Sequence, residues 1–383
     1  MQRRDFVKLG SMLAAAPGSA FAEKPFTQGV NNAQSVDFLN DGLVLSPREY
    51  AELLIKLADE GKIKPDCYSN GGVVEELENK FAQLLGKESS VFMPTGTLAN
   101  HMAIRKLSGN NHRIIVQEQS HIYNDTGDAA QILSNLNLIP LGLNSVGFSV
   151  AEVEQVVAKT KAGRVEAHIG ALAIETPVRR QQDRIVPFDQ LKTMTDFARA
   201  NGIKTHLDGA RLFVQAVHEN IEPSQYGALF DTVFTSMWKC FNASSGAILA
   251  GDKAFTEKLF HERRMFGGGL PASWPFAAVA LHYADGFSNE YKKAWANAEK
   301  FFAEIEKNDK CKVVKLENGS HNVQLDILKT NLPKLRESLG KRNIRLSNPN
   351  TTGFILKVNP SINRTTPSSL AGYFLEAMKE AAA

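Results

Sequence analysis

The feature that most constrains the fold is a series of short apolar runs that alternate with helical patterns along the chain. These runs lack strict alternation of apolar and polar residues, which indicates strands covered on both faces, as in parallel sheets. We therefore predict an α/β fold with a mostly parallel, seven-stranded-type sheet flanked by helices. The strands are expected at residues 90–93, 113–116, 170–174, 203–207, 232–236 and 247–250.

The pattern changes beyond about residue 275. A long helical region is expected over 276–307, followed by strands at 313–316, 322–327 and 353–358 and a last helix at 368–381. We therefore predict a large domain at 47–275 and a smaller α+β domain at 276–383. A polar arm at 23–46 precedes them.

Composition excludes several classes of protein. The chain has 383 residues, 43% of them hydrophobic, and a formal net charge of only +3. Acidic and basic residues are mixed along the chain, so nothing indicates nucleic-acid binding. Three cysteines without a C-x-x-C pair predict neither a disulfide framework nor a metal site. The expected partner is a small molecule.

The first 22 residues have the pattern of an export signal. Arg3 and Arg4 are followed by Phe6 and Lys8, then by a weakly apolar run and the small-residue site at 20–22. This is typical of a twin-arginine signal peptide, and an amphipathic N-terminal helix is the alternative. We expect a periplasmic protein that has no membrane association once the signal is removed.

A predicted strand-to-helix turn offers an anion-binding site. Gly96 and Thr97 follow the strand at 90–93 and precede a helical stretch at 98–107. Backbone N–H groups at a helix start, together with the Thr97 hydroxyl, suit a phosphate, although an ordinary capped turn has the same letters.

Two charged residues follow the strand at 203–207. Asp208 places a carboxylate at the strand end, or alternatively caps a helix expected at 210–217. Arg211 lies in the first turn of that helix, where the helix dipole disfavours a cation. We therefore expect Arg211 to have an anionic partner.

Lys239 and His121 also lie at predicted strand ends. Trp238, Cys240 and Phe241 surround Lys239, so the amine is expected to be desolvated and nucleophilic. The alternative for Lys239 is an ordinary surface lysine. The alternative for His121 is a position in the core, in place of stacking on a ring. An anion cradle, a histidine, a carboxylate and a lysine together match the needs of pyridoxal phosphate.

With these motifs, the chain resembles the threonine aldolase and β-eliminating lyase family of aspartate-aminotransferase-like, fold type I pyridoxal phosphate enzymes. The resemblance covers nearly the whole chain after residue 22. The run His-Leu-Asp-Gly-Ala-Arg-Leu at 206–212, at its distance before Lys239, is its most specific part. Other matching stretches are 77–82, 92–100, 120–122, 174–176 and 267–269.

The resemblance implies roles for these residues. Lys239 would bond the cofactor aldehyde, Asp208 would pair with the ring nitrogen and His121 would stack on the ring. Gly96 and Thr97 would hold the phosphate. The remaining roles concern two arginine positions: Arg211 would lie near the substrate carboxylate or the ring oxygen, and Arg263 or Arg264 would reach a neighbouring subunit of a homodimer or homotetramer.

The sequence also departs from the family pattern. Trp238 precedes the lysine, and Cys240, Phe241 and Asn242 follow it where glycines and leucine are usual. Asn40-Asp41 replaces a serine-aspartate pair, and Pro271-Ala272 an arginine-glutamine pair. The arginine that would clamp the substrate carboxylate falls near 355–357 and is absent. Lys357 or Arg364 are its candidate substitutes.

The expected reaction is cleavage of a β-hydroxy-α-amino acid such as threonine into glycine and an aldehyde, with Lys239 and His121 as catalytic residues. The altered clamp affects reaction choice, because the clamp sets which bond lies perpendicular to the cofactor ring. β-Elimination and racemisation are therefore alternatives, as is a binding protein without turnover.

Overall fold

The computed structural model describes residues 35–165 and 167–382. The predicted export signal and the first part of the arm lie outside the described residues. Within the described part, no helix combines the length and apolar character needed to cross a membrane.

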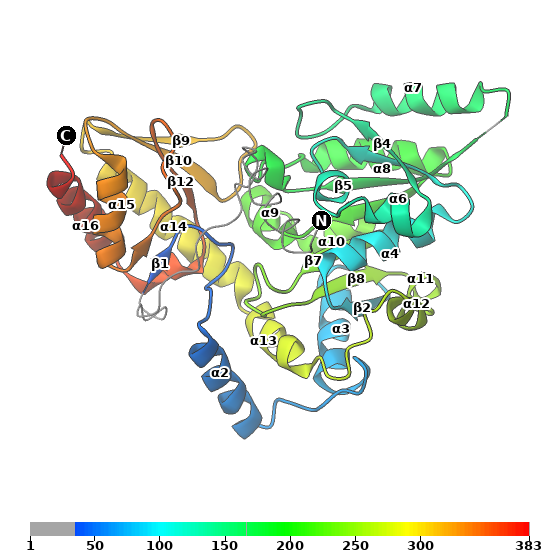
Figure 1. Cartoon of the computed structure of the whole chain (residues 1–383), viewed down its shortest axis with the longest axis horizontal. Coiled ribbons are helices and arrows are strands. Elements are labelled where there is room, and N and C mark those ends of the chain that lie inside the picture. Colours follow the sequence, from blue (N-terminus) through cyan, green and yellow to red (C-terminus); the bar gives the residue numbers. More distant parts are fainter. Residues whose placement is uncertain (1–34, 166, 383) are drawn as a thin grey trace, which may run out of the picture. The chain divides into compact units, whose positions relative to one another are not determined.

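A seven-stranded sheet forms the centre of the larger part of the chain (Figure 1). Its order is β2-β8-β7-β6-β5-β3-β4, and only β8 runs antiparallel to its neighbours. The predicted mostly parallel α/β sheet is confirmed. The strands are β2 (Ser89–Met93), β3 (Arg113–Gln117), β4 (Asn137–Leu141), β5 (Ile169–Glu175), β6 (Lys204–Asp208), β7 (Thr232–Ser236) and β8 (Ala247–Gly251).

Strand β4 was not predicted from the sequence. It contains Pro140, which cannot donate a backbone hydrogen bond and argues against a central strand. The structure places β4 at the edge of the sheet, paired only with β3. A proline is tolerated there because one side of an edge strand needs no partner.

Both faces of the sheet are covered by helices. In β5, Leu172 and Ile174 join one apolar cluster, whereas Ala171 and Ala173 join another on the opposite face. The first cluster includes residues of α3 (Gly72–Leu84), α8 (Phe188–Ala200), α9 (Leu212–Glu219), α10 (Pro223–Leu229) and α13 (Trp274–Ala284). The second includes residues of α4 (Gly96–Ser108) and α6 (Ala129–Ser134).

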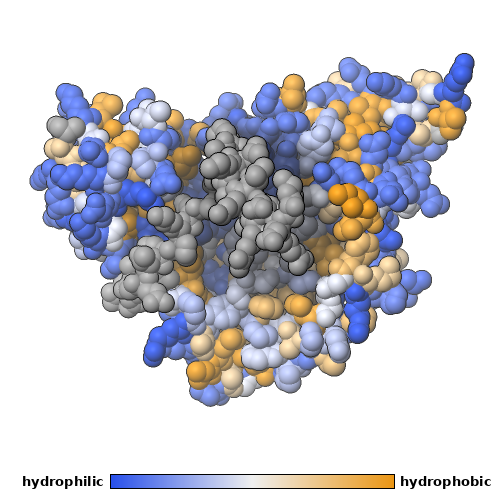
Figure 2. All heavy atoms as spheres, in the orientation of Figure 1, coloured by the Kyte–Doolittle hydropathy of each residue, from blue (hydrophilic) through white to orange (hydrophobic). Residues whose placement is uncertain are grey.

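The remaining helices of the larger part lie around this layered core. They are α2 (Pro47–Asp59), α5 (His121–Asn124), α7 (Val150–Lys161), α11 (Lys253–Thr256) and α12 (Leu259–Met265). Ser46 caps α2 by accepting a hydrogen bond from Glu49 N, and Pro47 opens the helix. Apolar side chains exposed on α6, Ile132 and Leu133, form part of an orange patch in Figure 2.

The last third of the chain builds a second apolar core. Strands β9 (Cys311–Lys315), β10 (Asn322–Ile327) and β12 (Gly353–Lys357) form an antiparallel sheet. The arm contributes β1 (Val36–Asp37), which pairs with β11 (Ile344–Arg345). The helices are α14 (Phe287–Ile305), α15 (Leu332–Lys341) and α16 (Pro367–Glu380). The domain boundaries near residues 46 and 275 stay predictions.

The long helical region expected at 276–307 is present, but it is divided. The region forms two helices, α13 and α14, separated by Asp285 and Gly286. Glycine is a poor helix former, so an Asp-Gly pair is a natural break.

Candidate active site

A cavity of about 200 Å³ lies where the strands β5, β6 and β7 end. The structure brings six of the residues predicted for the site to its wall. These residues are Gly96, Thr97, His121, Asp208, Arg211 and Lys239. Their individual roles stay predictions. The residues meet at the carboxyl edge of the sheet, which is where open α/β sheets bind ligands.

The start of α4 forms the predicted anion cradle. The Thr95 side chain caps the helix by accepting a hydrogen bond from Leu98 N, and Gly96 and Thr97 form the first turn. An added Cβ on Gly96 would lie 2.7 Å from Phe234 Cζ, so only glycine fits between the helix and β7. N–H groups of a first turn have no partner within the helix, which suits a phosphate.

Asp208 is held by a buried chain of hydrogen bonds. Asn100 Nδ2 donates to Asp208 Oδ2 over 2.7 Å, and Asn100 Oδ1 lies 2.9 Å from His206 Nε2. His206 Nδ1 in turn contacts Thr232 Oγ1 at 2.8 Å. Burial lowers the pKa of His206 to about 4, so the ring is neutral.

One expectation about this segment needs correction, and one site residue was missed. The Asp208 carboxylate accepts from Ala210 N at 3.3 Å but caps no helix, because α9 begins only at Leu212. Asn100 was not among the predicted site residues. A buried amide in the middle of an amphipathic helix was the signal that could have revealed it.

Glu175 is a second site residue that the prediction missed. It ends β5 opposite Asp208 in the sheet register, and it lines the cavity. Its carboxyl oxygens accept hydrogen bonds from His121 N at 2.5 Å and Arg179 N at 2.9 Å. Burial, together with the nearby Asp208 charge, raises the pKa of Glu175 to about 8. Glu175 therefore fixes the backbone from which His121 projects.

Lys239 lies three residues beyond the end of β7, and its side chain is partly buried. Burial, reinforced by the Arg211 charge, lowers the pKa of Lys239 to about 8. Its neighbour Trp238 is 53% exposed, whereas Cys240 is buried and the pKa of its thiol is raised to about 12 by burial. The amine is the reactive group of this loop, and the thiol stays protonated.

The arm packs directly on the lysine loop. An added Cβ on Gly42 would lie 2.4 Å from the Lys239 carbonyl oxygen, and Leu43 N donates to Asn242 Oδ1 over 2.7 Å. Asn242 itself has a left-handed backbone, with φ of 57°. Asn242, one of the unusual residues after Lys239, thus fits the loop against the arm.

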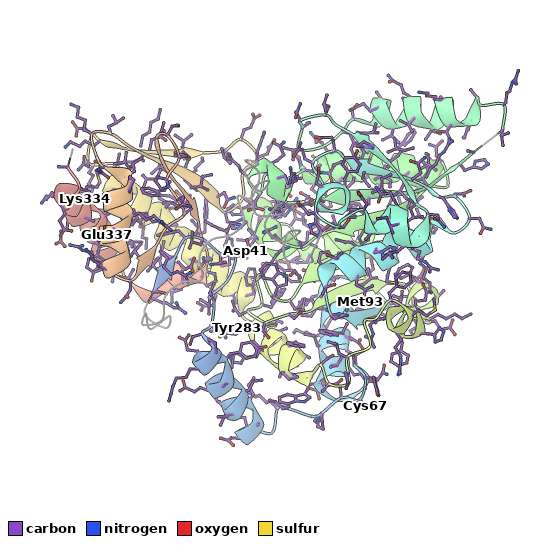
Figure 3. All side chains as sticks on the ribbon, in the orientation of Figure 1. Asp41, Cys67, Met93, Tyr283, Lys334 and Glu337 are labelled. Carbon is purple, nitrogen blue, oxygen red and sulfur yellow. The ribbon has the colours of Figure 1, made fainter. Side chains whose placement is uncertain are left out.

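Arg211 has the anionic partners expected for it, although it lies just before α9 instead of within its first turn. Its Nε lies 2.8 Å from Asp41 Oδ1, and its Nη1 lies 3.4 Å from Asp183 Oδ1. Lys357 and His321 complete this buried cluster around Asp41, which is labelled in Figure 3. Asp41, Asp183 and His321 are also close enough together to hold a metal ion.

The candidate replacements for the missing clamp arginine are both engaged. Lys357 Nζ lies 3.1 Å from Asp41 Oδ1 and 3.0 Å from Asp183 Oδ2. Arg364 donates to the Ser35 carbonyl over 2.8 Å and lines a different cavity.

Arg263 is not available to a neighbouring subunit. It is fully buried and donates to the carbonyl oxygens of Phe92 and Tyr68. Arg264, whose guanidinium carbon lies 4.5 Å from the centre of the Tyr68 ring, is the remaining candidate for that role.

Comparison with known proteins identifies the family of the chain. A sequence profile of the β-eliminating lyases matches residues 62–329. The chain belongs to the β-eliminating lyase family. This confirms the resemblance found in the sequence. It also confirms the predicted class of enzyme, a pyridoxal-phosphate-dependent lyase.

Individual relatives of this β-eliminating lyase family member are distant. A probable low-specificity L-threonine aldolase of Schizosaccharomyces pombe is 30% identical over 252 residues, which are 64% of each chain. An alanine racemase, TOXG, of Cochliobolus carbonum is 27% identical over 56% of this chain and 55% of its own length. The chain therefore spans less than two thirds of these two relatives.

Solved structures show the same fold. A threonine aldolase of Leishmania major superposes with a TM-score of 0.67 at 15% identity, over 90% of this chain and 99% of that one. The chain's own residues also fit pyridoxal phosphate, because a glycine-floored helix start, a buried carboxylate and an amine of lowered pKa line one cavity.

Proposed function

We propose that this protein is a pyridoxal-phosphate-dependent lyase that splits a β-hydroxy-α-amino acid, such as threonine, into glycine and an aldehyde. The observation that supports this is the meeting of Gly96, Asp208, His121 and Lys239 in one cavity. Low-specificity threonine aldolases among its relatives favour this reaction over others of the family.

Each residue has a distinct task in this proposal. The first turn of α4, with Gly96 and Thr97, would hold the phosphate, and Lys239 would bond the cofactor covalently. The Asp208 carboxylate, fixed by Asn100, would keep the ring nitrogen protonated. The cofactor supplies the electron sink that accepts the electron pair of the broken bond.

The bond cleavage needs a base beside the substrate hydroxyl. His121 or a water held by it would take the hydroxyl proton as the Cα–Cβ bond breaks, so that the β-carbon leaves as an aldehyde. The proton taken from the hydroxyl would then be returned to Cα, which completes glycine. His121 Nδ1 lies 3.5 Å from Asp125 Oδ2, which orients the ring.

Two alternative reactions would use the same cofactor but give different products. Racemisation is favoured by the alanine racemase among the relatives, and β-elimination by the altered clamp. Neither would release an aldehyde from threonine. A protein that binds without turnover would release no product at all.

The test begins with loading the purified protein with pyridoxal phosphate. A visible absorption band is expected that borohydride removes while it fixes the cofactor to Lys239. Lys239→Ala should lack the band, and Lys258→Ala, at an exposed lysine, should keep it. Threonine and an aldehyde trap are then added. The lyase assignment fails if wild-type protein never acquires the band, and retro-aldol cleavage fails if a loaded protein forms no aldehyde.

The location of the protein is a separate part of the proposal. The arginine pair and small-residue site of residues 1–22 support export to the periplasm by the twin-arginine route. Replacing Arg3 and Arg4 by lysine should leave the protein uncleaved in the cytoplasmic fraction. Unchanged processing of that variant would contradict the proposed route.

A further inference from the structure

Arg179 is a cation on the wall of the active-site cavity that the proposed reaction does not use. It follows the end of β5 and begins a short 3₁₀ helix, Arg179–Gln181. Its side chain is 30% exposed. Arg211 lies on the same wall, after β6, and is the residue expected near the substrate α-carboxylate. A second guanidinium group in this cavity therefore indicates a second anionic group in the ligand.

Asp125 places Arg179 beside His121. Arg179 Nη2 lies 2.6 Å from Asp125 Oδ2, and His121 Nδ1 lies 3.5 Å from the same oxygen. Glu175 joins the two residues a second time, because its carboxyl oxygens accept hydrogen bonds from the backbone N–H groups of His121 and Arg179. The side chains of His121 and Arg179 are therefore neighbours on the cavity wall.

Arg179 can bind a ligand while it keeps its contact with Asp125. A guanidinium group has several N–H donors in a planar fork, so it can serve more than one acceptor at a time. Arg180 Nη1 lies 3.3 Å from the other oxygen of Asp125. Burial would raise the pKa of Asp125, but the hydrogen bond and the charge of Arg179 outweigh burial and lower it, so Asp125 is ionised. This single carboxylate is shared by two guanidinium groups and does not cancel the charge of both.

The position beside His121 decides which part of a substrate Arg179 would meet. In the proposed reaction His121, or a water held by it, takes the proton of the β-hydroxyl group, so the β-carbon lies next to the histidine. The remaining substituent of the β-carbon, a methyl group in threonine, would then face the neighbouring guanidinium group. A methyl group gains nothing from a guanidinium, whereas a carboxylate accepts charge-assisted hydrogen bonds from it.

We propose that Arg179 is a specificity-determining residue that selects substrates with a carboxylate on the β-carbon. The substrate class is a β-hydroxy-α-amino acid with an acidic side chain. Its simplest member is 3-hydroxyaspartate, which is threonine with a carboxylate in place of the methyl group. Cleavage of its Cα–Cβ bond gives glycine and glyoxylate, and the hydroxyl proton ends on Cα, so no other reactant is consumed. This rests on the proposed function, since it names the substrate class of the same site.

Binding of aspartate and asparagine to the holoprotein measures this preference without retro-aldol cleavage. Both ligands lack the β-hydroxyl group, and they differ in the charge of a side-chain group of nearly the same size. Wild-type protein loaded with pyridoxal phosphate should bind aspartate about tenfold or more tightly than asparagine, because only aspartate offers a charged acceptor. Equal affinities in calorimetric titrations would overturn the proposal.

Arg179→Gln should abolish the preference for aspartate and leave asparagine binding nearly unchanged. Glutamine keeps the backbone N–H that donates to Glu175, so the end of β5 keeps this hydrogen bond. Equal weakening of both ligands in this variant would show a merely structural role and would overturn the proposal.

Arg180→Gln is the matched control. Arg180 contacts the same carboxylate of Asp125, but it is exposed and is not among the residues of the cavity wall. Its substitution removes the same charge and should retain the preference for aspartate. An equal loss of the preference in the two variants would show a general effect of charge and would overturn the proposal.

The same variants test whether Arg179 binds the cofactor instead of the substrate. Absorbance titration with pyridoxal phosphate should give similar affinities for wild type, Arg179→Gln and Arg180→Gln. A cofactor affinity about tenfold lower in Arg179→Gln alone would assign this guanidinium group to the cofactor phosphate and would overturn the proposal.

Cleavage assays separate the inference from the proposed reaction. The kcat/KM for 3-hydroxyaspartate should exceed that for threonine by about tenfold or more, and Arg179→Gln should remove this advantage mainly by raising KM for the acidic substrate. A holoprotein that prefers aspartate through Arg179 but forms neither acetaldehyde from threonine nor glyoxylate from 3-hydroxyaspartate would refute the retro-aldol function alone. A protein that cleaves threonine but binds aspartate and asparagine equally would refute the role of Arg179 alone.

Discussion

The side-chain amide of Asn100 in α4 donates a 2.7 Å hydrogen bond to the carboxylate of Asp208 at the end of β6. The carbonyl oxygen of the same amide faces the neutral ring of His206, two residues before Asp208 on the same strand. Because all three side chains are buried, this arrangement fixes one orientation of the carboxylate before any ligand arrives.

Asn100→Ala should weaken cofactor binding by about tenfold, because Asp208 would lose its fixed orientation and its donor. The free energy of unfolding should fall by about 1–3 kcal/mol, the cost of leaving buried polar partners unsatisfied. Absorbance titration with pyridoxal phosphate and urea unfolding measure the two effects. Asn297→Ala, which removes a partly buried amide far along the chain, should leave the titration unchanged. Equal cofactor affinity in Asn100→Ala and wild type would show that the bond has no role in binding.

Gly96→Ala should disturb the anion cradle. The new Cβ would lie 2.7 Å from Cζ of the Phe234 ring, which is only 2% exposed. Strain of about 1–3 kcal/mol is expected, with a shift of the first turn of α4 and weaker cofactor binding. Gly372→Ala in α16 is the matched control, because its Cβ would meet nothing within 4 Å. The control should be neutral or slightly stabilising in thermal unfolding. If both variants bind the cofactor equally well, Gly96 is not needed for close approach.

Lys239→Met should stabilise the cofactor-free protein at neutral pH. The pKa of Lys239 is about 8 in the folded chain, whereas the ordinary pKa of a lysine is 10.5, so folding disfavours the protonated amine. The unfolded chain binds more protons between these values, and the stability contributed by this site rises with pH across that window. The gain from methionine should be on the order of 2–3 kcal/mol at pH 7 and should vanish toward pH 10. Urea unfolding at several pH values measures it, and a gain independent of pH would contradict the shifted pKa.

Glu175→Gln should change the slope of stability against pH. The pKa of Glu175 is about 8 when folded, whereas the ordinary pKa of a glutamate is 4.5, so the folded chain binds its proton more tightly. In the wild type, the contribution of Glu175 to the free energy of unfolding is therefore present at low pH. It is lost as the pH rises from about 4.5 to about 8. Glutamine does not titrate, so the difference between variant and wild type should grow across that window by a few kcal/mol. The loss of one acceptor for His121 N or Arg179 N adds an offset that is constant with pH.

The matched control for this slope is Glu337→Gln. Glu337 is exposed on α15 and is labelled in Figure 3, and its partner is Lys341 in the next turn. Its substitution should produce no comparable slope, because solvent screens an exposed pair. Similar slopes in the two variants would mean that Glu175 is not protonated in the folded protein at neutral pH.

Much of the fold could be predicted because it follows from local pattern. The run at 232–236 predicts a strand buried on both faces, and the structure has a buried strand there. The start of α2 at Ser46 and Pro47 likewise depends on groups within one turn, which the sequence contains in full. Strand β4 was missed because its proline is acceptable only at the edge of the sheet, which is a matter of position in the fold.

The sequence by itself determined which reactive groups end up at the carboxyl edge of the sheet, because Asp208 and Lys239 are tied to strands whose direction the fold class sets. Only the tertiary structure decided what surrounds them. Asn100 contacts Asp208 from a helix and Glu175 contacts His121 from a neighbouring strand, so no spacing in the sequence reveals these contacts. Burial and the nearby Asp208 charge then raise the pKa of Glu175, and both are properties of the assembled neighbourhood, not of any one segment.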